Sequence, residues 1–285
     1  MEKPKFIYKY HSAERIAQIL RDLTFYMAPV SQLNDLYEFR LRSLCTTSSE
    51  SKIKILAKNM VMDGIFDKTD KALEFLKKLE QSNSLPENYE SNYRYTLDAL
   101  YKNLDNVGRH TGVTCFSEYR NDQRMWATYG NNHTGAVIEF HTDNSASRLA
   151  KHLMPTIYLE ENPQLCPSEL IKEDGTFNWY VGGFLCCFKT NHWRDEGEWR
   201  LLLMTNTEQT KEERIVAFER SFVSRVFLGP RISEGDEREI REICNTYSPV
   251  IPVFKRKIDE LEAREEYEGF EIIHSFEQMK YWFDK

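Results

Sequence analysis

The sequence predicts an α+β fold: a mixed, largely antiparallel sheet with flanking helices and one helical insertion. Strand patterns alternate with helix patterns, but without the regular strand–helix–strand rhythm of a parallel doubly wound sheet. The chain contains no G-x-G-x-x-G turn, no Walker sequence and no repeat of fixed period. We therefore expect a single α+β domain over residues 1–285, with the helical insertion at about residues 48–106.

The N-terminal segment predicts a strand, a helix and a second strand. Residues 6–9 alternate as a short strand does, and Ser12 is a suitable N-cap for a helix with one apolar face. Residues 24–27 predict the second strand, which Pro29 ends. The polar turn that follows carries Asn34, Asp35 and Glu38.

Residues 48–106 differ in composition from the segments around them. They are rich in Lys and Glu and space their apolar residues as amphipathic helices do, with a break at residues 82–86. We expect two or three helices here, with their charged side chains on a solvated face.

Strands and helices alternate again in the remainder of the chain. Strands are predicted at residues 112–117, 136–140, 154–159, 201–204, 222–228, 250–254 and 269–273. Helices are predicted after Asp122, at 145–153 and after Ser233, and a charged helix or linker at 255–265. Residues 163–178 are typical of a loop, and the apolar run 184–188 fits either a helix or a strand.

The segment Trp193–Arg200 is the most informative stretch, directly before the apolar strand at 201–204. It contains Glu196 and Glu198, which an extended chain would place on one face. Apolar aromatic surroundings raise the pKa of a carboxyl group and arginines lower it. The pair therefore suits acid/base or charge-stabilising chemistry, and it equally suits a structural ion-pair cluster. Glu198 is the stronger candidate for a site residue, because a charged group at the start of an apolar strand needs a partner.

Composition narrows the class of protein. A net charge of −7 argues against non-specific nucleic-acid binding but leaves room for a local basic surface. No apolar run has the length of a membrane span, and the N-terminus lacks the apolar core of a signal peptide. The six cysteines form no C-x-x-C pair, so we expect reduced thiols, no metal and a cytoplasmic location.

Motifs spread over most of the chain outside the insertion resemble a bacterial family known as domain of unknown function 2971. The matching residues are Tyr8, Tyr10, Ser12, Asn34, Asp35, Glu38, Phe116, Ser117, Met125, Trp126, Tyr129, His133, Gly135, Trp193, Glu196, Glu198, Trp199 and Arg200. Leu36 and Tyr37 replace the Pro-Phe pair of the family, which puts the geometry of that turn in doubt. The family name implies no activity.

The order of elements is also similar to that of ADP-ribosyltransferase-like enzymes. These enzymes carry a His or Arg near an N-terminal strand, a Tyr or Ser after the next helix and a Glu on a late strand. Here His11, Tyr26 and Glu198 take those positions, with Glu196 as the companion residue. The resemblance implies a split sheet, NAD as a small-molecule nucleotide substrate, a protein or nucleic-acid acceptor, and a role as a bacterial toxin or anti-phage effector.

The resemblance also implies a role for each residue. Glu198 would hold the ribose hydroxyl and stabilise an oxocarbenium-like state, and Glu196 would orient or deprotonate the acceptor. His11 would hydrogen-bond the other ribose. The aromatic surface for nicotinamide would come from Trp126, Tyr129 or Tyr26. The pyrophosphate would be bound by Arg200 or Arg124.

Two other functions fit the same residues. A non-catalytic sensor would use the Trp, Tyr and Arg side chains as a ligand or partner pocket, since these residue types dominate binding sites. A metal-dependent hydrolase or nuclease would use carboxylates as ligands. Its candidate residues are Asp35, Glu38, Glu196 and Glu198. The sequence does not decide the acceptor or the oligomeric state.

Overall fold

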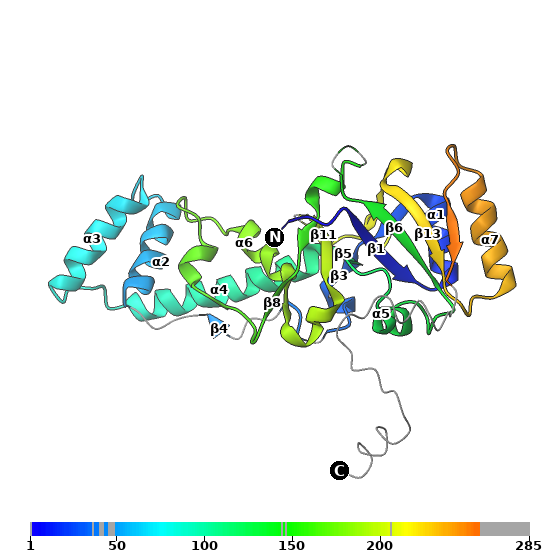
Figure 1. Cartoon of the computed structure of the whole chain (residues 1–285). Helices are drawn as coiled ribbons and strands as arrows, with labels where there is room; N and C mark the ends of the chain where they lie inside the picture. The colour runs from blue at the N-terminus through cyan, green and yellow to red at the C-terminus, as the bar shows by residue number, and fades with distance from the viewer. Residues whose placement is uncertain are drawn as a thin grey trace, which may run out of the picture.

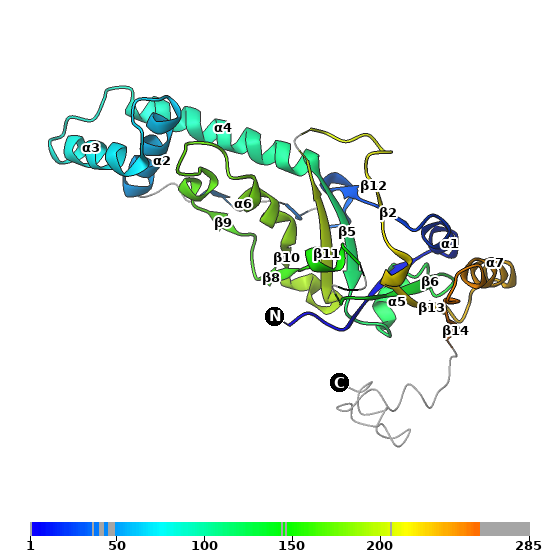
Figure 2. The ribbon, with the colours of Figure 1, turned by 90° about the horizontal axis from the view of Figure 1, so that it is seen from above.

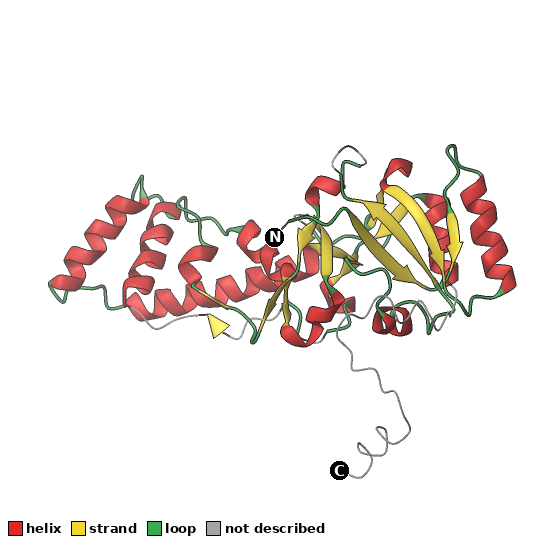
Figure 3. Ribbon diagram, in the orientation of Figure 1, coloured by secondary structure: helices red, strands yellow, loops and turns green. Residues whose placement is uncertain are grey.

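One mixed sheet organises the structure (Figures 1 and 3). The computed structural model describes residues 2–35, 37–39, 43–44, 49–143, 145, 147–205 and 207–256. The strands of the main sheet are β1 (Phe6–His11), β3 (Ala28–Pro29), β5 (Thr111–Ser117), β6 (Ala136–His141), β7 (Met154–Pro155), β11 (Glu198–Met204), β13 (Val223–Leu228) and β14 (Val253–Lys255). Their order is β14-β13-β6-β1-β5-β11-β7, with β3 also beside β5. Every pair is antiparallel except β13–β14, so the predicted α+β class is confirmed.

Shorter strands and the helices complete the fold. Further two-stranded pairs are β2 (Thr24–Tyr26) with β12 (Ile215–Ala217), β8 (Ile157–Leu159) with β10 (Phe188–Thr190), and β4 (Ser43–Leu44) with β9 (Gln164–Leu165). The α-helices are α1 (Ala13–Asp22), α2 (Ser49–Met62), α3 (Thr69–Gln81), α4 (Tyr89–His110), α5 (Gln123–Thr128), α6 (Trp179–Phe184) and α7 (Glu234–Asn245).

The main sheet is joined weakly at its centre. Strand β1 pairs with β6 along its whole length, and β11 pairs with β5 along its whole length. In contrast, β1 pairs with β5 only at Tyr8 and Ser117. The two halves of the sheet therefore diverge from this single pair, and the divergence exposes side chains of both strands to a shared space.

The main core lies between the sheet and the helices α1 and α7, which pack together behind it in Figure 1. The Ser12 hydroxyl caps α1 by accepting a hydrogen bond from the Arg15 N–H, as the sequence predicts. An aromatic group fills the centre of this core, where the Phe25 and Phe218 rings stack with centroids 4.3 Å apart. Burial of these rings fixes β1 and α1, which carry His11 and Arg15, against the sheet.

The helices α2, α3 and α4 form a lobe that extends from one end of the sheet (Figure 2). Two apolar clusters hold this lobe together, one of them around Ile53, Ala72 and Leu76. The long helix α4 continues directly into β5 at Thr111. Because β5 is a central strand of the sheet, the lobe is connected to the part of the fold where the two halves diverge.

Two local predictions are wrong. The sequence predicts a helix at residues 145–153, but the described residues of this stretch, 145 and 147–153, contain only a 3-10 turn at Ala150–His152. The Asp143 carboxylate and the Ser147 hydroxyl accept backbone N–H groups of Ser145 and Leu149, and such local hydrogen bonds compete with a helix. The predicted loop 163–178 also contains a strand, β9, and a 3-10 helix at Pro167–Leu170.

Three other expectations concern the apolar run 184–188, the C-terminal residues and membrane-spanning helices. The apolar run 184–188 combines the end of α6, a 3-10 turn and the start of β10. The predicted strand at 269–273 and most of the predicted helix or linker at 255–265 lie outside the described residues. Within the described part of the chain, no helix combines the length and apolar character needed to cross a membrane.

Candidate functional site

A pocket of about 850 Å³ lies where β1 and β5 diverge. Five residues to which the ADP-ribosyltransferase-like resemblance assigns a role line this pocket: His11, Tyr26, Tyr129, Glu196 and Glu198. They come from β1, β2, the end of α5 and the start of β11, so the fold brings together residues that are distant in sequence. The predicted residues Trp126 and Arg200 do not line it.

The Lys189 ammonium group is the centre of the acidic end of the pocket. Its Nζ atom lies 2.7 Å from Glu196 Oε2, 3.0 Å from Glu198 Oε2 and 3.6 Å from Glu38 Oε1. The ring of Trp193 packs against the same group, with its centroid 4.6 Å from Nζ. Lysine therefore occupies the position among three carboxylates where a metal-dependent enzyme would place a cation. Among the described residues, no group of three or more metal-ligating side chains is arranged to bind a metal ion.

Arg200 supports Glu198 from behind the pocket. Its Nε donates to Glu198 Oε1 at 2.8 Å and its Nη2 donates to Glu198 Oε2 at 3.0 Å. The same guanidinium also donates to Glu38 and to the Cys186 carbonyl oxygen. Only 1% of the Arg200 side chain is exposed. Its donors are thus used inside the protein, and the residue fixes the direction of the Glu198 carboxylate.

The carboxyl groups in this network have pKa values displaced in opposite directions. Burial opposes ionisation of Glu198, but the charges of Arg200 and Lys189 outweigh it and lower its pKa to about 2. For Glu38, burial is the stronger effect and raises the pKa, although the same two cations oppose it. Neighbouring carboxyl groups with separated pKa values are typical of acid/base sites and of buried ion-pair networks.

Glu196 and Glu198 also have fixed hydroxyl neighbours. The Tyr129 hydroxyl donates to Glu196 Oε1 at 2.6 Å and accepts from Asn34 Nδ2 at 2.6 Å. The Tyr158 hydroxyl accepts a hydrogen bond from the Glu198 backbone N–H at 2.8 Å. Both carboxylates are therefore held in one orientation, which is what a preorganised site requires.

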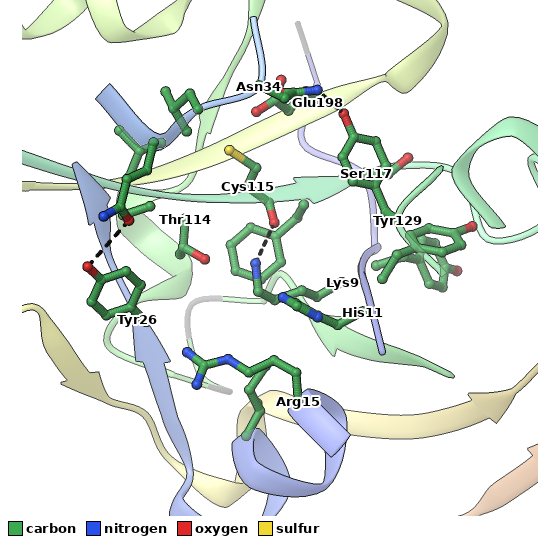
Figure 4. Close-up of a pocket in the computed structure, with 18 of the residues that line it drawn as sticks. Lys9, His11, Arg15, Tyr26, Asn34, Thr114, Cys115, Ser117, Tyr129 and Glu198 are labelled. Atoms are coloured by element: carbon green, nitrogen blue, oxygen red, sulfur yellow. Dashed lines mark hydrogen bonds between the residues drawn. The ribbon is translucent and has the colours of Figure 1, made fainter. Parts of the chain in front are cut away.

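The opposite side of the pocket is basic (Figure 4). Lys9 and His11 occupy successive inward-facing positions of β1, and Arg15 lies in the first turn of α1. Lys9 Nζ donates to the Cys115 carbonyl oxygen at 3.0 Å, whereas Arg15 bonds only the neutral Gln18 side chain among the described residues. Lys211 adds a further cation to the lining.

Two polar atoms beside the pocket lack partners in the described structure. The Thr114 hydroxyl and Glu38 Oε2 are buried without a hydrogen bond, and both residues belong to the pocket lining. A buried polar atom without a partner costs about 1–3 kcal/mol. A polar ligand in the pocket would remove this cost.

The comparison with protein families identifies one segment of the chain. Residues 125–201, from α5 to β11, match the model of a family described as "Protein of unknown function (DUF2971)". This segment belongs to the DUF2971 family. The resemblance predicted from the sequence is confirmed for these residues, and the DUF2971 segment contains Tyr129, Lys189, Glu196 and Glu198. Neither the comparison with curated proteins nor that with solved structures gives a match.

Within the DUF2971 segment, the chain around the two carboxylates differs from the extended form expected from the sequence. Glu196 ends a 3-10 helix, Asn191–Glu196, and Gly197 has a φ of +50°. Glycine accepts this left-handed conformation without the cost a side chain would add. Glu196 and Glu198 nevertheless converge, because the turn directs both carboxylates to Lys189.

Trp126, also in the DUF2971 segment, is part of the core. Its ring packs edge-on against Tyr10 at a centroid distance of 5.4 Å, and its indole N–H donates to the Arg120 carbonyl oxygen. Only 1% of the residue is exposed. The other predicted pyrophosphate ligand, Arg124, is an exposed partner of Asp122 and Asp195 and is not among the pocket residues.

Lys189, Lys9 and Arg15 were not among the residues singled out from the sequence. Signals for two of them are present. Lys189 directly follows the apolar run 184–188, and a lysine in such a position has to be paired when it is buried. Lys9 alternates with Ile7 along the predicted strand at residues 6–9, and His11 would join the same face if the strand continued. Arg15 carries no comparable signal.

We expect His11 to remain neutral in mildly acidic solution. Although its ring is open to the pocket, burial by the surrounding chain and, to a smaller extent, the positive charges of Lys9 and Arg15 together lower its pKa to about 4. An unfolded chain has a histidine pKa of about 6.5, so it binds more protons between these values and stability rises with pH across this window. The measurement is imidazole titration by NMR. A titration midpoint above 6 would contradict this prediction, and Lys9→Met should raise the midpoint.

Proposed function

We propose that the protein is an NAD-dependent, ADP-ribosyltransferase-like enzyme that cleaves the nicotinamide–ribose bond in this pocket. The observation that carries the proposal is the charge arrangement of one pocket. The carboxyl groups of Glu198 and Glu196 lie at one end, whereas Lys9, Arg15 and Lys211 lie at the other. NAD has a matching arrangement, with a cationic nicotinamide ring and an anionic pyrophosphate joined through ribose.

The acidic end suits the bond-breaking step. As nicotinamide leaves with the bonding electron pair, positive charge develops on the ribose ring, and a fixed carboxylate stabilises that charge. Glu198 takes this role because it is ionised at neutral pH and held by Arg200. Glu196 takes the proton from the acceptor hydroxyl or amine as the new bond to ribose forms. Tyr129 and Tyr26 offer aromatic surface in the same lining.

The basic end suits the pyrophosphate. Lys9 and Arg15 replace Arg200 and Arg124 in this role, since they line the pocket and Arg200 is buried within its own ion pairs. His11, neutral at physiological pH and adjacent to both, is placed to hydrogen-bond a ribose hydroxyl. The opening between β1 and β5 supports the split sheet that the resemblance implies.

One observation favours a non-catalytic sensor instead. Both oxygens of Glu198 and both oxygens of Glu196 already accept hydrogen bonds from protein groups. A carboxylate that is fully bound in this way can serve to hold the pocket in shape. A sensor would bind NAD, or another nucleotide, without releasing nicotinamide.

The test is nicotinamide release from NAD by the purified protein, with cell extract as the source of acceptor. Arg15→Gln should raise the KM for NAD about tenfold with little change in kcat, because a charged hydrogen bond to phosphate is lost. Arg148→Gln, which removes an exposed arginine outside the pocket lining, is the matched control. Binding of NAD without release would favour the sensor, and absence of NAD binding would contradict both the enzyme and a sensor of NAD.

A further inference from the structure

The face of β1, β6, β13 and β14 opposite the main core carries a group of aromatic rings. Alternation in these strands directs Phe6, His141, Phe227 and Phe254 to this side. Phe6 lies against His141 with centroids 5.1 Å apart, and Phe227 stacks on Phe254 at 5.8 Å. Helix α5 covers only the end near Tyr10, and above it in Figure 1 no described helix crosses this side of the strands.

Cations lie over these rings. The guanidinium of Arg120 is 4.9 Å from the Phe227 ring centroid, and that of Arg225 is 5.7 Å from the Phe6 centroid. The Lys5 ammonium is 5.3 Å from the Phe6 centroid on the same face. Arg256 extends the set, 5.4 Å from the ring of Trp126. We call these four cations and the four aromatic residues named above the aromatic–basic face.

The charge of this face is the reverse of the charge of the whole protein. The chain has a net charge of −7. On the four strands of the face, however, the single carboxylate is Glu139, which is buried and neutralised by Arg225 at 2.6 Å. Phe254 is 50% exposed, so one large ring is open to solvent beside the cations. An exposed aromatic ring beside arginines suits a ligand that is both anionic and flat.

We propose that the aromatic–basic face binds single-stranded nucleic acid. Phosphate groups would bind Lys5, Arg120 and Arg256, while bases would stack on Phe254 and its neighbours. A duplex keeps its bases stacked inside and presents only phosphates, so it would use the cations but not the rings. An acidic protein segment would likewise use the cations alone.

The aromatic–basic face adjoins the pocket, so a nucleic acid bound to it would lie near the proposed reaction site. Tyr8 lies on β1 between Phe6 and Tyr10 and also lines the pocket, so the face leads to the pocket mouth. A strand bound there would be the acceptor of the proposed transfer reaction. That consequence rests on the proposed function, whereas the binding itself does not.

The experiment is fluorescence anisotropy with a labelled single-stranded DNA oligonucleotide, without NAD, over a range of salt concentrations. We expect log Kd to change with log salt at a slope of about 2 to 3, because about 0.7 counterion is released for each phosphate contacted on a single strand. Arg120→Gln should lower that slope by about 0.7. Phe254→Ala should weaken binding about tenfold at every salt concentration, since base stacking is lost.

Arg21→Gln is the matched control, because it removes the same charge from the exposed side chain of Arg21 on α1. Equal losses for Arg21→Gln and Arg120→Gln would overturn the proposal, as would equal affinity for a duplex or competition by polyglutamate at equal charge. Circular dichroism checks that each variant is folded. Because the anisotropy experiment contains no NAD and measures no reaction, failure of the binding and failure of the proposed enzyme activity are separate results.

Discussion

Arg200→Met should be among the most destabilising single substitutions in this protein. The guanidinium holds Glu198 and Glu38 in a region where only 1% of the arginine side chain is exposed. Methionine fills similar space but leaves both carboxylates with Lys189 as their remaining cation. Removing one partner of a buried ion pair costs about 3–5 kcal/mol. We expect a loss of this size in the free energy of unfolding, measured by urea denaturation at pH 7.

The pH dependence of this loss is a further check. In the wild type, the pKa of Glu198 is lowered to about 2, whereas an unfolded glutamate has a value of about 4.3. Its stabilising contribution is therefore complete above the unfolded value and disappears as the pH falls toward 2. Since Arg200→Met removes the main cause of this shift, the difference between variant and wild type should shrink as the pH falls through the same range.

Two further variants separate charge from side-chain shape. Arg148→Met removes an exposed arginine from an ion pair with Glu219, where 89% of the arginine side chain is exposed, and should have little effect. Arg200→Lys keeps one charge but loses the two parallel hydrogen bonds to Glu198, so an intermediate loss is expected. A similar urea midpoint for Arg200→Met and Arg148→Met would show that the buried network does not stabilise the fold.

Local patterns in the sequence predict much of the fold, because helices and strands depend largely on interactions between residues that are close in sequence. The helix capped by Ser12 and the β5 and β11 strands depend on apolar spacing, capping and β-branched residues, which can be seen in a short window. The helix expected at 145–153 failed for a reason that is also local, since side chains there bond their own backbone. The pairing of β1 with β5 at one residue pair, in contrast, depends on long-range packing that no short window contains.

The same difference between local and long-range interactions explains which site residues can be predicted from the sequence. Glu196 and Glu198 are close in sequence and flanked by unusual residues, so they were visible as a pair. Their cation, Lys189, reaches them because β10 pairs with β8 and a 3-10 helix turns the chain back toward β11. Arg15 lines the pocket because α1 follows β1 directly and packs against β1, β2 and β6. Such residues become visible when the tertiary structure is known.

Glu196→Gln should give the largest loss of transferase activity with the smallest change in the fold. The amide keeps an oxygen that accepts the Tyr129 hydrogen bond, and Lys189 keeps Glu198 and Glu38 as partners. What disappears is the base that takes the acceptor proton, and loss of a general base costs about 10²–10⁴ in rate. Transfer of ADP-ribose to the acceptor, measured with labelled NAD, should fall by this factor, while nicotinamide release to water should fall less.

Glu198→Gln provides the contrast that assigns the two roles. It removes the carboxylate expected to stabilise the developing charge on ribose, so transfer and nicotinamide release should fall together. Its stability must be measured alongside, because Arg200 and Lys189 lose a buried partner. Glu219→Gln, which removes a carboxylate from an ion pair outside the pocket lining, should change neither activity. If Glu196→Gln and Glu198→Gln both retain full activity while folded, the reaction does not use these carboxylates, and the network is then a structural support for the pocket.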